Sequence, residues 1–313
     1  NGQDGSYLSE LLLKKNYKVH GFVRTSFKIK NSKNNWKIKK NIKRITLHKV
    51  EYNDRDKLKK LIKKINPDEF YHLAAQSHDG HSFNNQFYTF DINLNYTHFL
   101  LSSAYDINKK IKFFNASSSE IYEKNPKRKI NEETLHNPSS AYGISKLASF
   151  YLVKNYRQNY GMHASNGILF NHESPIKNEN FVLRKISKSV ARIKSDLQKK
   201  IKLGNIKSKR DWGHAEDFAN AMWMICKHKK GDDYIIGTGK LHSVEDFARI
   251  AFNHVKLNYK KYIKFDKKFV RKKDSNARIA DTSKIRKILK WKPKYDFKSL
   301  VLDMVKSDLN RLK

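Results

Sequence analysis

Short apolar runs alternate with amphipathic stretches over the first half of the sequence. The runs have the length of buried strands, and we expect strands at residues 19–23, 45–50, 70–73, 111–115 and 167–170. The stretches between them repeat apolar residues at helical spacing and predict helices at residues 7–15, 55–65, 92–107 and 141–160. This alternation predicts an α/β fold, a Rossmann-like, doubly wound parallel sheet with helices on both faces.

The pattern is less regular after Phe170. Helices are expected at residues 181–196, 215–227, 244–255 and 297–312. We interpret this part as a smaller C-terminal α/β domain that closes over the end of the sheet.

The chain begins with a glycine turn that leads straight into a helix. Gly2 and Gly5 flank this turn, and no apolar run precedes it. Such a turn normally joins the first, central strand of a dinucleotide-binding fold to its helix. We therefore expect that the first strand of the sheet is missing from this sequence, the alternative being a genuine short start.

Composition narrows the class of protein. Among 313 residues Cys226 is the single cysteine, which excludes an intrachain disulfide framework. No apolar run approaches the roughly 18–20 residues of a membrane span, and no signal peptide is visible. We expect a soluble, cytoplasmic protein.

The formal net charge of +36 raises the possibility of a nucleic-acid partner. The lysines are spread over the whole chain and no nucleic-acid-binding motif accompanies them. We therefore favour lysines on solvated faces over a nucleic-acid-binding surface.

Four residues form a candidate acid/base set. Tyr142 and Lys146 lie four residues apart on an expected helix and so share one face. An ammonium beside a phenol favours the phenolate. Ser118 and Glu120 follow an expected strand and add a hydroxyl and a carboxylate. Together they suit removal of a proton from a sugar alcohol while a hydride leaves its carbon. The alternative is a solvated tyrosine and lysine, with the serines capping a helix.

Two long strings are distinctive: Asn-Gly-Ile-Leu-Phe-Asn-His-Glu-Ser-Pro at residues 166–175 and Lys-Arg-Asp-Trp-Gly-His at residues 209–214. They resemble the GDP-mannose 4,6-dehydratase family of extended short-chain dehydrogenases/reductases. Strings at residues 2–8, 19–24, 71–78 and 181–187 follow the family's order, so the resemblance covers essentially the whole chain.

The resemblance implies a lyase of nucleotide-sugar metabolism, on the route to GDP-fucose. It would convert GDP-mannose to GDP-4-keto-6-deoxymannose and water, with a tightly bound NADP that is oxidised and reduced within each turnover. It also implies a homo-oligomer, a dimer or a tetramer. From the charge distribution and the lack of a long apolar run we expect neither a nucleic-acid nor a membrane partner. The dinucleotide-binding Rossmann domain would span residues 1–170, with residues 206–238 returning to it, and residues 171–313 would mainly bind substrate.

The resemblance assigns site residues position by position. The catalytic residues would be Ser118, Glu120, Tyr142 and Lys146. Cofactor would be bound by Gly2, Gln3, Asp4, Gly5, Arg24, Thr25, Ser26, Glu51, Leu73, Ala74, Ala75, Gln76, Ser77, Tyr88, Tyr142, Lys146, His172 and Lys177. Substrate would be bound by Ser118, Glu120, Asn171, Lys185, Lys209, Arg210, Arg271 and Asp274. No metal site is expected.

The choice of NADP over NAD follows from Arg24, Thr25 and Ser26. An NAD enzyme usually has an acid at this strand end, whereas an arginine and hydroxyls suit a 2′-phosphate. Two departures from the family bear on assembly and substrate. Ile176-Lys177 replaces paired arginines, and the segment Arg271-Lys272-Lys273-Asp274 replaces Arg-Pro-x-Glu.

Three alternatives stay open at this point. A related nucleotide-sugar epimerase or reductase would use the same hydroxyl, tyrosine and lysine without losing water. Glu120 discriminates, because a simple ketoreductase needs no additional base. A basic nucleic-acid-binding protein on an inactive copy of the fold would bind oligonucleotides in a salt-sensitive way. An inert truncated product is the third.

Overall fold

Consecutive apolar residues give the central strands two buried faces. The structure is a computed structural model that describes residues 1–27, 36–77, 83–269 and 277–312. Phe113 packs with residues of one face of the sheet and its neighbour Phe114 with residues of the other. The four strands are all parallel and lie in the order β10-β6-β4-β3. Their bounds are β3 (Glu69–His72), β4 (Lys112–Ser118), β6 (Ala164–Leu169) and β10 (Asp233–Ile236).

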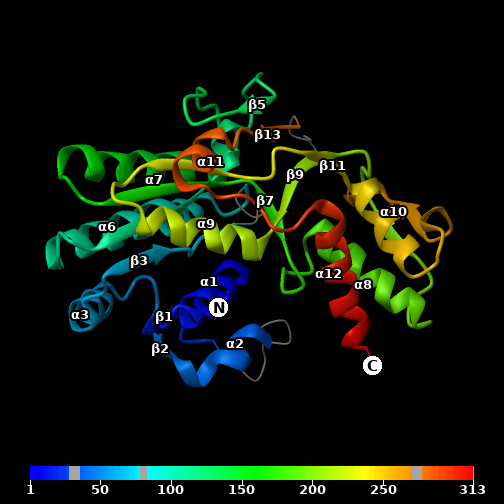
Figure 1. The fold of residues 1–313 in the computed structure, drawn as a ribbon, viewed down its shortest axis with the longest axis horizontal. Coiled ribbons are helices and arrows are strands. Elements are labelled where there is room, and N and C mark those ends of the chain that lie inside the picture. The colour runs from blue at the N-terminus through cyan, green and yellow to red at the C-terminus, as the bar shows by residue number, and fades with distance from the viewer. Residues whose placement is uncertain (28–35, 78–82, 270–276, 313) are drawn as a thin grey trace.

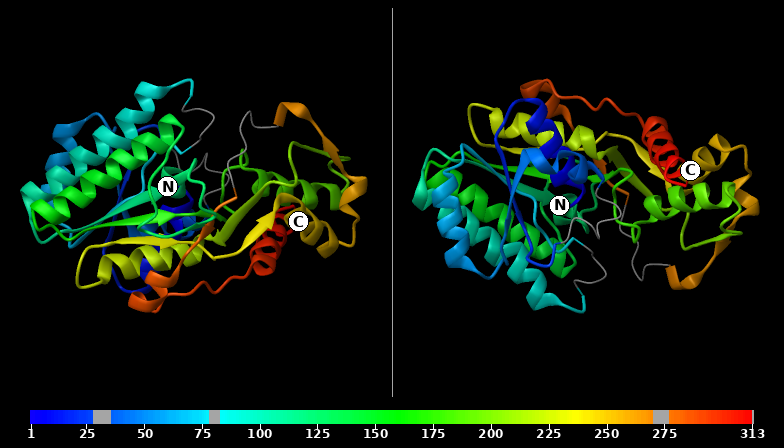
Figure 2. Two further views of the ribbon diagram at one scale, coloured as in Figure 1. Left: turned by 90° about the horizontal axis from the view of Figure 1, so that it is seen from above. Right: turned by 90° about the horizontal axis from the view of Figure 1, so that it is seen from below.

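Helices cover both faces of this sheet (Figures 1 and 2). One face packs against α3 (Arg55–Ile65), α6 (Tyr96–Ile107) and α7 (Ala141–Asn159). The other face packs against α1 (Gln3–Lys14), α9 (Ala215–Lys227) and α11 (Ser283–Leu289). This arrangement confirms the doubly wound parallel α/β fold predicted from the sequence.

The sheet is divided by a gap. Strands β1 (Val19–Val23) and β2 (Ile45–Lys49) form a separate parallel pair, with Val19 opposite Ile45. Within the described residues no strand lies between β1 and β3, so both present backbone edges to the gap.

A second core holds the C-terminal part together. Its helices are α8 (Val182–Lys194), α10 (Val244–His254) and α12 (Phe297–Asn310), which lie beside one another in Figure 1. Fully buried side chains at their centre include Val190, Phe247 and Met304. Two small sheets complete this part, one formed by β8 (Ile201–Leu203) and β12 (Ile263–Phe265), the other by β7 (Asn171–Glu173), β9 (Lys209–His214) and β11 (Leu241–Ser243).

The chain crosses between the two parts more than once. Helix α9 packs against α1, and β10 pairs with β6 in register Asp233 to Asn166. Residues 215–236 therefore contribute helix α9 and strand β10 to the layers of the main sheet. The predicted domain boundaries themselves stay a prediction.

All five predicted strands and all eight predicted helices are present, with ends that differ by a few residues. The predicted start of the helix at residues 92–107 was wrong. Asp91–Asn95 form a π-helical turn, and the α-helix α6 begins only at Tyr96. The pattern did not predict the short elements, because partners distant in the sequence set them. These are α2 (Trp36–Asn41), α5 (Gln86–Phe90), α11, β5 (Lys129–Ile130) and β13 (Ile279–Ala280), besides β7 to β12.

Candidate active site

A cavity of about 1970 Å³ lies at the carboxyl ends of β3, β4 and β6. It exceeds the 300–1,000 Å³ usual for ligand pockets because it runs from the gap beside β1 to helix α8. Most of the predicted site residues line it: Gly2, Gln3, Asp4, Gly5, Arg24, Leu73, Ala74, Ala75, Gln76, Ser77, Tyr88, Ser118, Glu120, Tyr142, Lys146, Asn171, His172, Lys177, Lys185 and Arg210.

The four predicted catalytic residues come from two elements. Helix α7 begins after Ser140, whose hydroxyl accepts from the amide of Gly143, and it carries Tyr142 and Lys146. Strand β4 ends at Ser118, whose hydroxyl accepts from the amide of Glu120 at 3.2 Å. All four line the cavity, and α7 approaches the turn of Glu120 closely at Gly143.

Lys146 is almost fully buried beside the cavity. Its ammonium donates a hydrogen bond to the carbonyl of Ala116 in β4 at 2.9 Å. Burial disfavours the charged amine and lowers the pKa of Lys146 to about 8. A lysine with this pKa is still mostly charged at neutral pH and is suited to stabilise a phenolate one helical turn away.

Two residues next to Glu120 were not predicted. Arg278, which is buried, donates to Glu120 Oε1 at 3.1 Å and to the carbonyl of Glu123 at 2.8 Å. Gly143 allows α7 to approach closely, since an added Cβ there would lie 2.9 Å from the carbonyl oxygen of Glu120. The Tyr-Gly-x-x-Lys string was a signal for Gly143, whereas nothing local in the sequence marked Arg278.

The first turn of α1 offers a binding surface for phosphate. Gly2 is the N-cap of the helix, and it lines the cavity together with Gln3, Asp4 and Gly5, so the positive end of the helix dipole lies at the cavity. An added Cβ at Gly2 or Gly5 would meet nothing within 4 Å, which leaves open space for a group lying against the backbone. This cradle fits the pyrophosphate of a dinucleotide.

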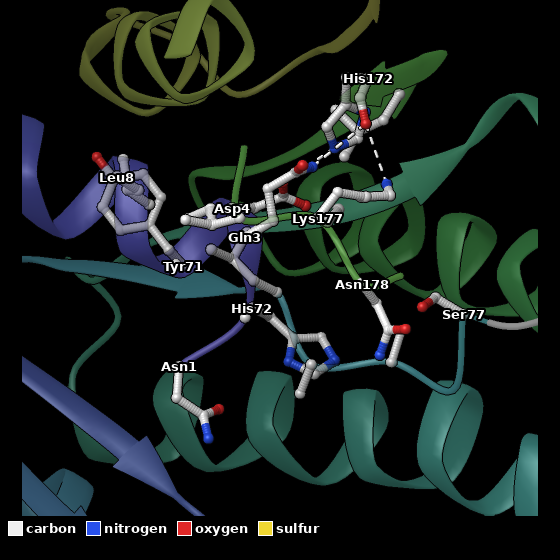
Figure 3. Close-up of a pocket in the computed structure, with 18 of the residues that line it drawn as sticks. Asn1, Gln3, Asp4, Leu8, Tyr71, His72, Ser77, His172, Lys177 and Asn178 are labelled. Carbon is white, nitrogen blue, oxygen red and sulfur yellow. Dashed lines mark hydrogen bonds and ion pairs between the residues drawn. The ribbon is translucent and has the colours of Figure 1, made fainter. Parts of the chain in front are cut away.

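His172 joins α1 to the far end of β6 (Figure 3). Its Nε2 lies 2.9 Å from Asp4 Oδ1 and its Nδ1 lies 2.8 Å from the carbonyl of Phe170. Burial alone would raise the pKa of Asp4, but the charge and hydrogen bond of His172, followed by Lys177 and Gln3, hold that pKa well below its ordinary value. Lys177 and Gln3 also donate to the carbonyl of His172, at 3.0 and 3.2 Å. The cluster therefore fixes the start of α1 relative to the sheet.

The loop after β3 is held by a residue that was not predicted. The amide of Gln76 donates to Asn93 Oδ1 at 2.9 Å, and Asn93 Nδ2 donates to the carbonyl of Gln76 and to Ser145 Oγ. Asn93 lies in the π-helical turn before α6 and is fully buried. It connects the predicted cofactor-binding loop to the helix that carries Tyr142.

The ends of β1 and β2 meet through a carboxylate. The amide of Thr25 donates to Glu51 Oε1 at 2.8 Å, and the hydroxyl of Thr25 donates to the same oxygen. These bonds, the hydroxyl first and the amide next, lower the pKa of Glu51. Arg24 lines the cavity, whereas Thr25, Ser26 and Glu51 are not among the lining residues.

The predicted substrate-binding residues are brought together in part. Asn171, Lys185 and Arg210 line the cavity; Lys185 donates to the carbonyl of Lys202 at 2.8 Å. Lys209 is exposed at the start of β9 and is not among the lining residues. Arg271 and Asp274 lie outside the described residues.

The described residues include neither a candidate membrane span nor a metal-binding group. No described helix is both long enough and apolar enough to span a bilayer. Nor does the described part of the chain contain a group of three acidic, histidine or cysteine side chains arranged to hold a metal ion.

Comparison with known proteins identifies the family. The family model described as GDP-mannose 4,6 dehydratase matches residues 1–304. The chain belongs to the GDP-mannose 4,6-dehydratase family. It is 41% identical to GDP-mannose 4,6 dehydratase 1 of Arabidopsis thaliana over 320 residues, which cover 100% of this chain and 88% of that protein. It is 38% identical to the Homo sapiens GDP-mannose 4,6 dehydratase over 338 residues, covering 100% of this chain and 90% of the human protein.

Solved structures agree with the fold of this dehydratase-family chain. RMD from Pseudomonas aeruginosa, complexed with NADPH, superposes with a TM-score of 0.80 at 20% identity and covers 94% of this chain and 100% of its own. A dTDP-glucose 4,6-dehydratase from Bacillus anthracis in complex with NAD gives a TM-score of 0.82 at 21% identity, covering 98% and 93%. At these identities the likeness concerns the fold alone.

Proposed function

We propose that this chain converts GDP-mannose to GDP-4-keto-6-deoxymannose and water, with a nicotinamide cofactor that is regenerated in each turnover. The observation that carries this proposal is the position of Glu120. It lines the same cavity as Ser118, Tyr142 and Lys146 and adds a carboxylate to the hydroxyl, phenol and ammonium of a sugar oxidoreductase. Membership of the GDP-mannose 4,6-dehydratase family supports the substrate.

The cofactor-binding surface would be formed by the first turn of α1, the loop after β3 and the end of β1. Gly2 and Gly5 would leave room for the pyrophosphate, and His172 would fix this turn through Asp4. When bound, the cofactor accepts a hydride from the sugar and later returns one. Arg24 favours NADP, because a guanidinium pairs with a 2′-phosphate.

Oxidation at C4 of the mannose would begin the reaction. Tyr142 would accept the O4 proton as hydride leaves C4, with Lys146 stabilising the phenolate and Ser118 donating a hydrogen bond. The burial of Lys146 strengthens this effect, since a charge in a water-poor environment acts on its neighbour more strongly.

Elimination of water would follow from the ketone at C4, which makes the C5 proton acidic. Glu120 would remove that proton, and the hydroxyl at C6 would leave as water after taking a proton from Glu120 or Tyr142. Hydride then returns to C6 while C5 is reprotonated, so the sequence consumes no reducing equivalent. An epimerase or reductase would not require this carboxylate.

Residues on the far side of the cavity would hold the nucleotide. Arg210 and Lys185 would offset the charge of the GDP phosphates, and Asn171 would contact the sugar. For Arg271, Asp274 and Lys209 the assignment rests on the family resemblance.

We also propose that the protein is a homo-oligomer. Helices α5 and α7 and the segment before α7 expose large apolar side chains: Phe87 is 95% exposed, Leu135 81%, Tyr151 49% and Ile144 45%. Such a group on a soluble protein typically marks an interface. A cytoplasmic location stays a prediction from the sequence.

Incubation of the protein with GDP-mannose, without added reduced cofactor, tests the reaction. Dehydration lowers the mass of the nucleotide sugar by one water, whereas epimerisation leaves the mass unchanged. Glu120→Gln should abolish water loss, and Glu133→Gln, an exposed glutamate outside the cavity, should leave it intact. Undiminished dehydration by Glu120→Gln would show that the assigned role is wrong.

A further inference from the structure

A buried arginine lies directly behind the candidate catalytic carboxylate. Arg278 is only 4% exposed, and its Nη2 lies 3.1 Å from Glu120 Oε1. A second guanidinium nitrogen donates to the carbonyl of Glu123, whereas Nε is buried without a partner in the described part of the chain. Burial of a guanidinium is costly unless charge and hydrogen bonds offset it, so its position needs a specific reason.

The backbone around Arg278 is fixed without help from Glu120. The residues after it form β13, which pairs in parallel with β5, Ile279 lying opposite Lys129. The amide of Ala280 donates to Asp211 Oδ2 at 3.1 Å. Asp211 also accepts from Thr238 and Gly239, so it connects β9, the end of β10 and β13. Arg278 therefore projects from a rigid support and can impose a position on the glutamate.

We propose that Arg278 is a positioning residue for Glu120, holding one carboxylate oxygen so that the group stays ionised and in one orientation between turnovers. The inference rests on the proposed catalytic role of Glu120. It deepens that proposal, because it specifies how the base is kept ready for the C5 proton.

The contact matters at two points of the elimination. Before the step, the guanidinium stabilises the carboxylate that must accept the proton. After the step, the C5–H bond is broken and Glu120 is a neutral acid beside a positive charge, which favours transfer of its proton to the departing C6 hydroxyl. Water leaves, Glu120 is again a carboxylate, and the pair with Arg278 is restored.

Other charged and titratable groups also lie near Glu120. They are Glu123 on its own turn, and Tyr142 and Lys146 on the packed helix α7. The carboxylate of Glu123 accepts from the hydroxyl of Ser139. Arg278 makes an ion pair with Glu120. Its removal should therefore raise the pKa of the Glu120 carboxyl group.

The test compares Arg278→Met, Arg278→Lys and a control, Arg157→Met. Arg157 also forms an ion pair, with Asp233 at 2.6 Å, but it lies outside the cavity. In Arg278→Met we expect kcat to fall about 100-fold with little change in KM, because the base is misplaced rather than the substrate released. The acidic limb of the pH–kcat profile should move up by about one pH unit. Arg278→Lys should recover part of both changes.

A direct titration separates this proposal from the proposed function. With ¹³C-labelled glutamate, the carboxyl carbon of Glu120 is followed by NMR in the ligand-free protein. Its midpoint should rise in Arg278→Met and stay unchanged in Arg157→Met. An unchanged midpoint and an unmoved acidic limb would overturn the proposal, even if activity fell. If Arg278→Met does not fold, the same comparison is made with Arg278→Lys. If the wild type releases no water from GDP-mannose, the proposed function fails while the titration still decides the role of Arg278.

Discussion

We expect buried Lys146 to lower the folding stability of the protein, although the proposed reaction requires its charge. In the folded state its amine is 2% exposed, and its pKa is about 8 instead of 10.5 because burial disfavours the charge. This difference corresponds to about 3 kcal/mol of folding free energy lost at neutral pH. The substitution Lys146→Met removes the charge and keeps a side chain of similar length.

The sign of the effect depends on pH in a defined window. Below about pH 8 the amine is charged in both states, and the folded protein bears the full cost of burying it. Between about pH 8 and 10.5 only the unfolded chain keeps the proton, so the cost declines, and above that range it vanishes. Against this gain, Lys146→Met loses the hydrogen bond to Ala116, worth about 1 kcal/mol.

We therefore expect Lys146→Met to be about 2 kcal/mol more stable than the wild type near neutral pH, with the gain lost as pH rises towards about 10. Its activity should fall by a factor of about 100 or more, because Tyr142 loses its cationic neighbour. Urea unfolding of the ligand-free proteins at several pH values measures the first effect. Lys59→Met, at an exposed lysine paired with Asp106, is the control and should change stability by less than about 0.5 kcal/mol at every pH. A variant that is less stable than the wild type by the same amount at every pH would refute the reasoning.

Three further substitutions test separate parts of the site. Gly143→Ala places a methyl group 2.9 Å from the carbonyl of Glu120, so α7 must shift; unfolding should show a loss of about 1–3 kcal/mol and assays a lower kcat, and wild-type values of both would contradict the packing argument. Glu51→Gln removes a negative charge beside Thr25; calorimetry should show a gain for NADP that NAD does not share, and an equal change for both cofactors would count against Arg24 as a 2′-phosphate ligand. Tyr142→Phe should lower kcat by about 100-fold or more without weakening GDP-mannose binding, and a matching loss of affinity would indicate a binding role instead.

Three of the four strands of the main sheet, β3, β4 and β6, were predictable because their signals are local, whereas β10 was not predicted. A strand buried on both faces reads as a short apolar run, and a surface helix reads as an apolar stripe, so Phe113 and Leu100 carry their own evidence. The site residues on strand ends, such as Ser118, followed from that assignment, since carboxyl ends of parallel strands meet at one edge. The motif strings predicted most of the other residues that line the cavity.

The parts that were missed depend on contacts between distant segments. Arg278 is 158 residues from Glu120 in the sequence, and Asn93 is 52 residues from Ser145. Neither residue type is distinctive at its position. Burial of an arginine cannot be inferred from sequence, because it requires knowledge of the carboxylate and carbonyl that offset its charge.

The site residues fall into two groups that lie on opposite sides of the gap and are held by different elements. Ser118, Tyr142 and Lys146 belong to β4 and α7, which pack within the continuous four-stranded sheet. Arg24 follows β1, on the far side of the gap, where the strand pair contacts the rest of the protein through α1 and α2 and through Phe22, whose ring packs against Phe70 of β3. A displacement of the β1–β2 pair therefore changes how firmly the adenosine end of a cofactor is held, but it leaves the spacing of the acid/base groups unchanged. Cofactor affinity should for this reason be the first property to weaken when this region is disturbed, and the geometry for proton transfer the last.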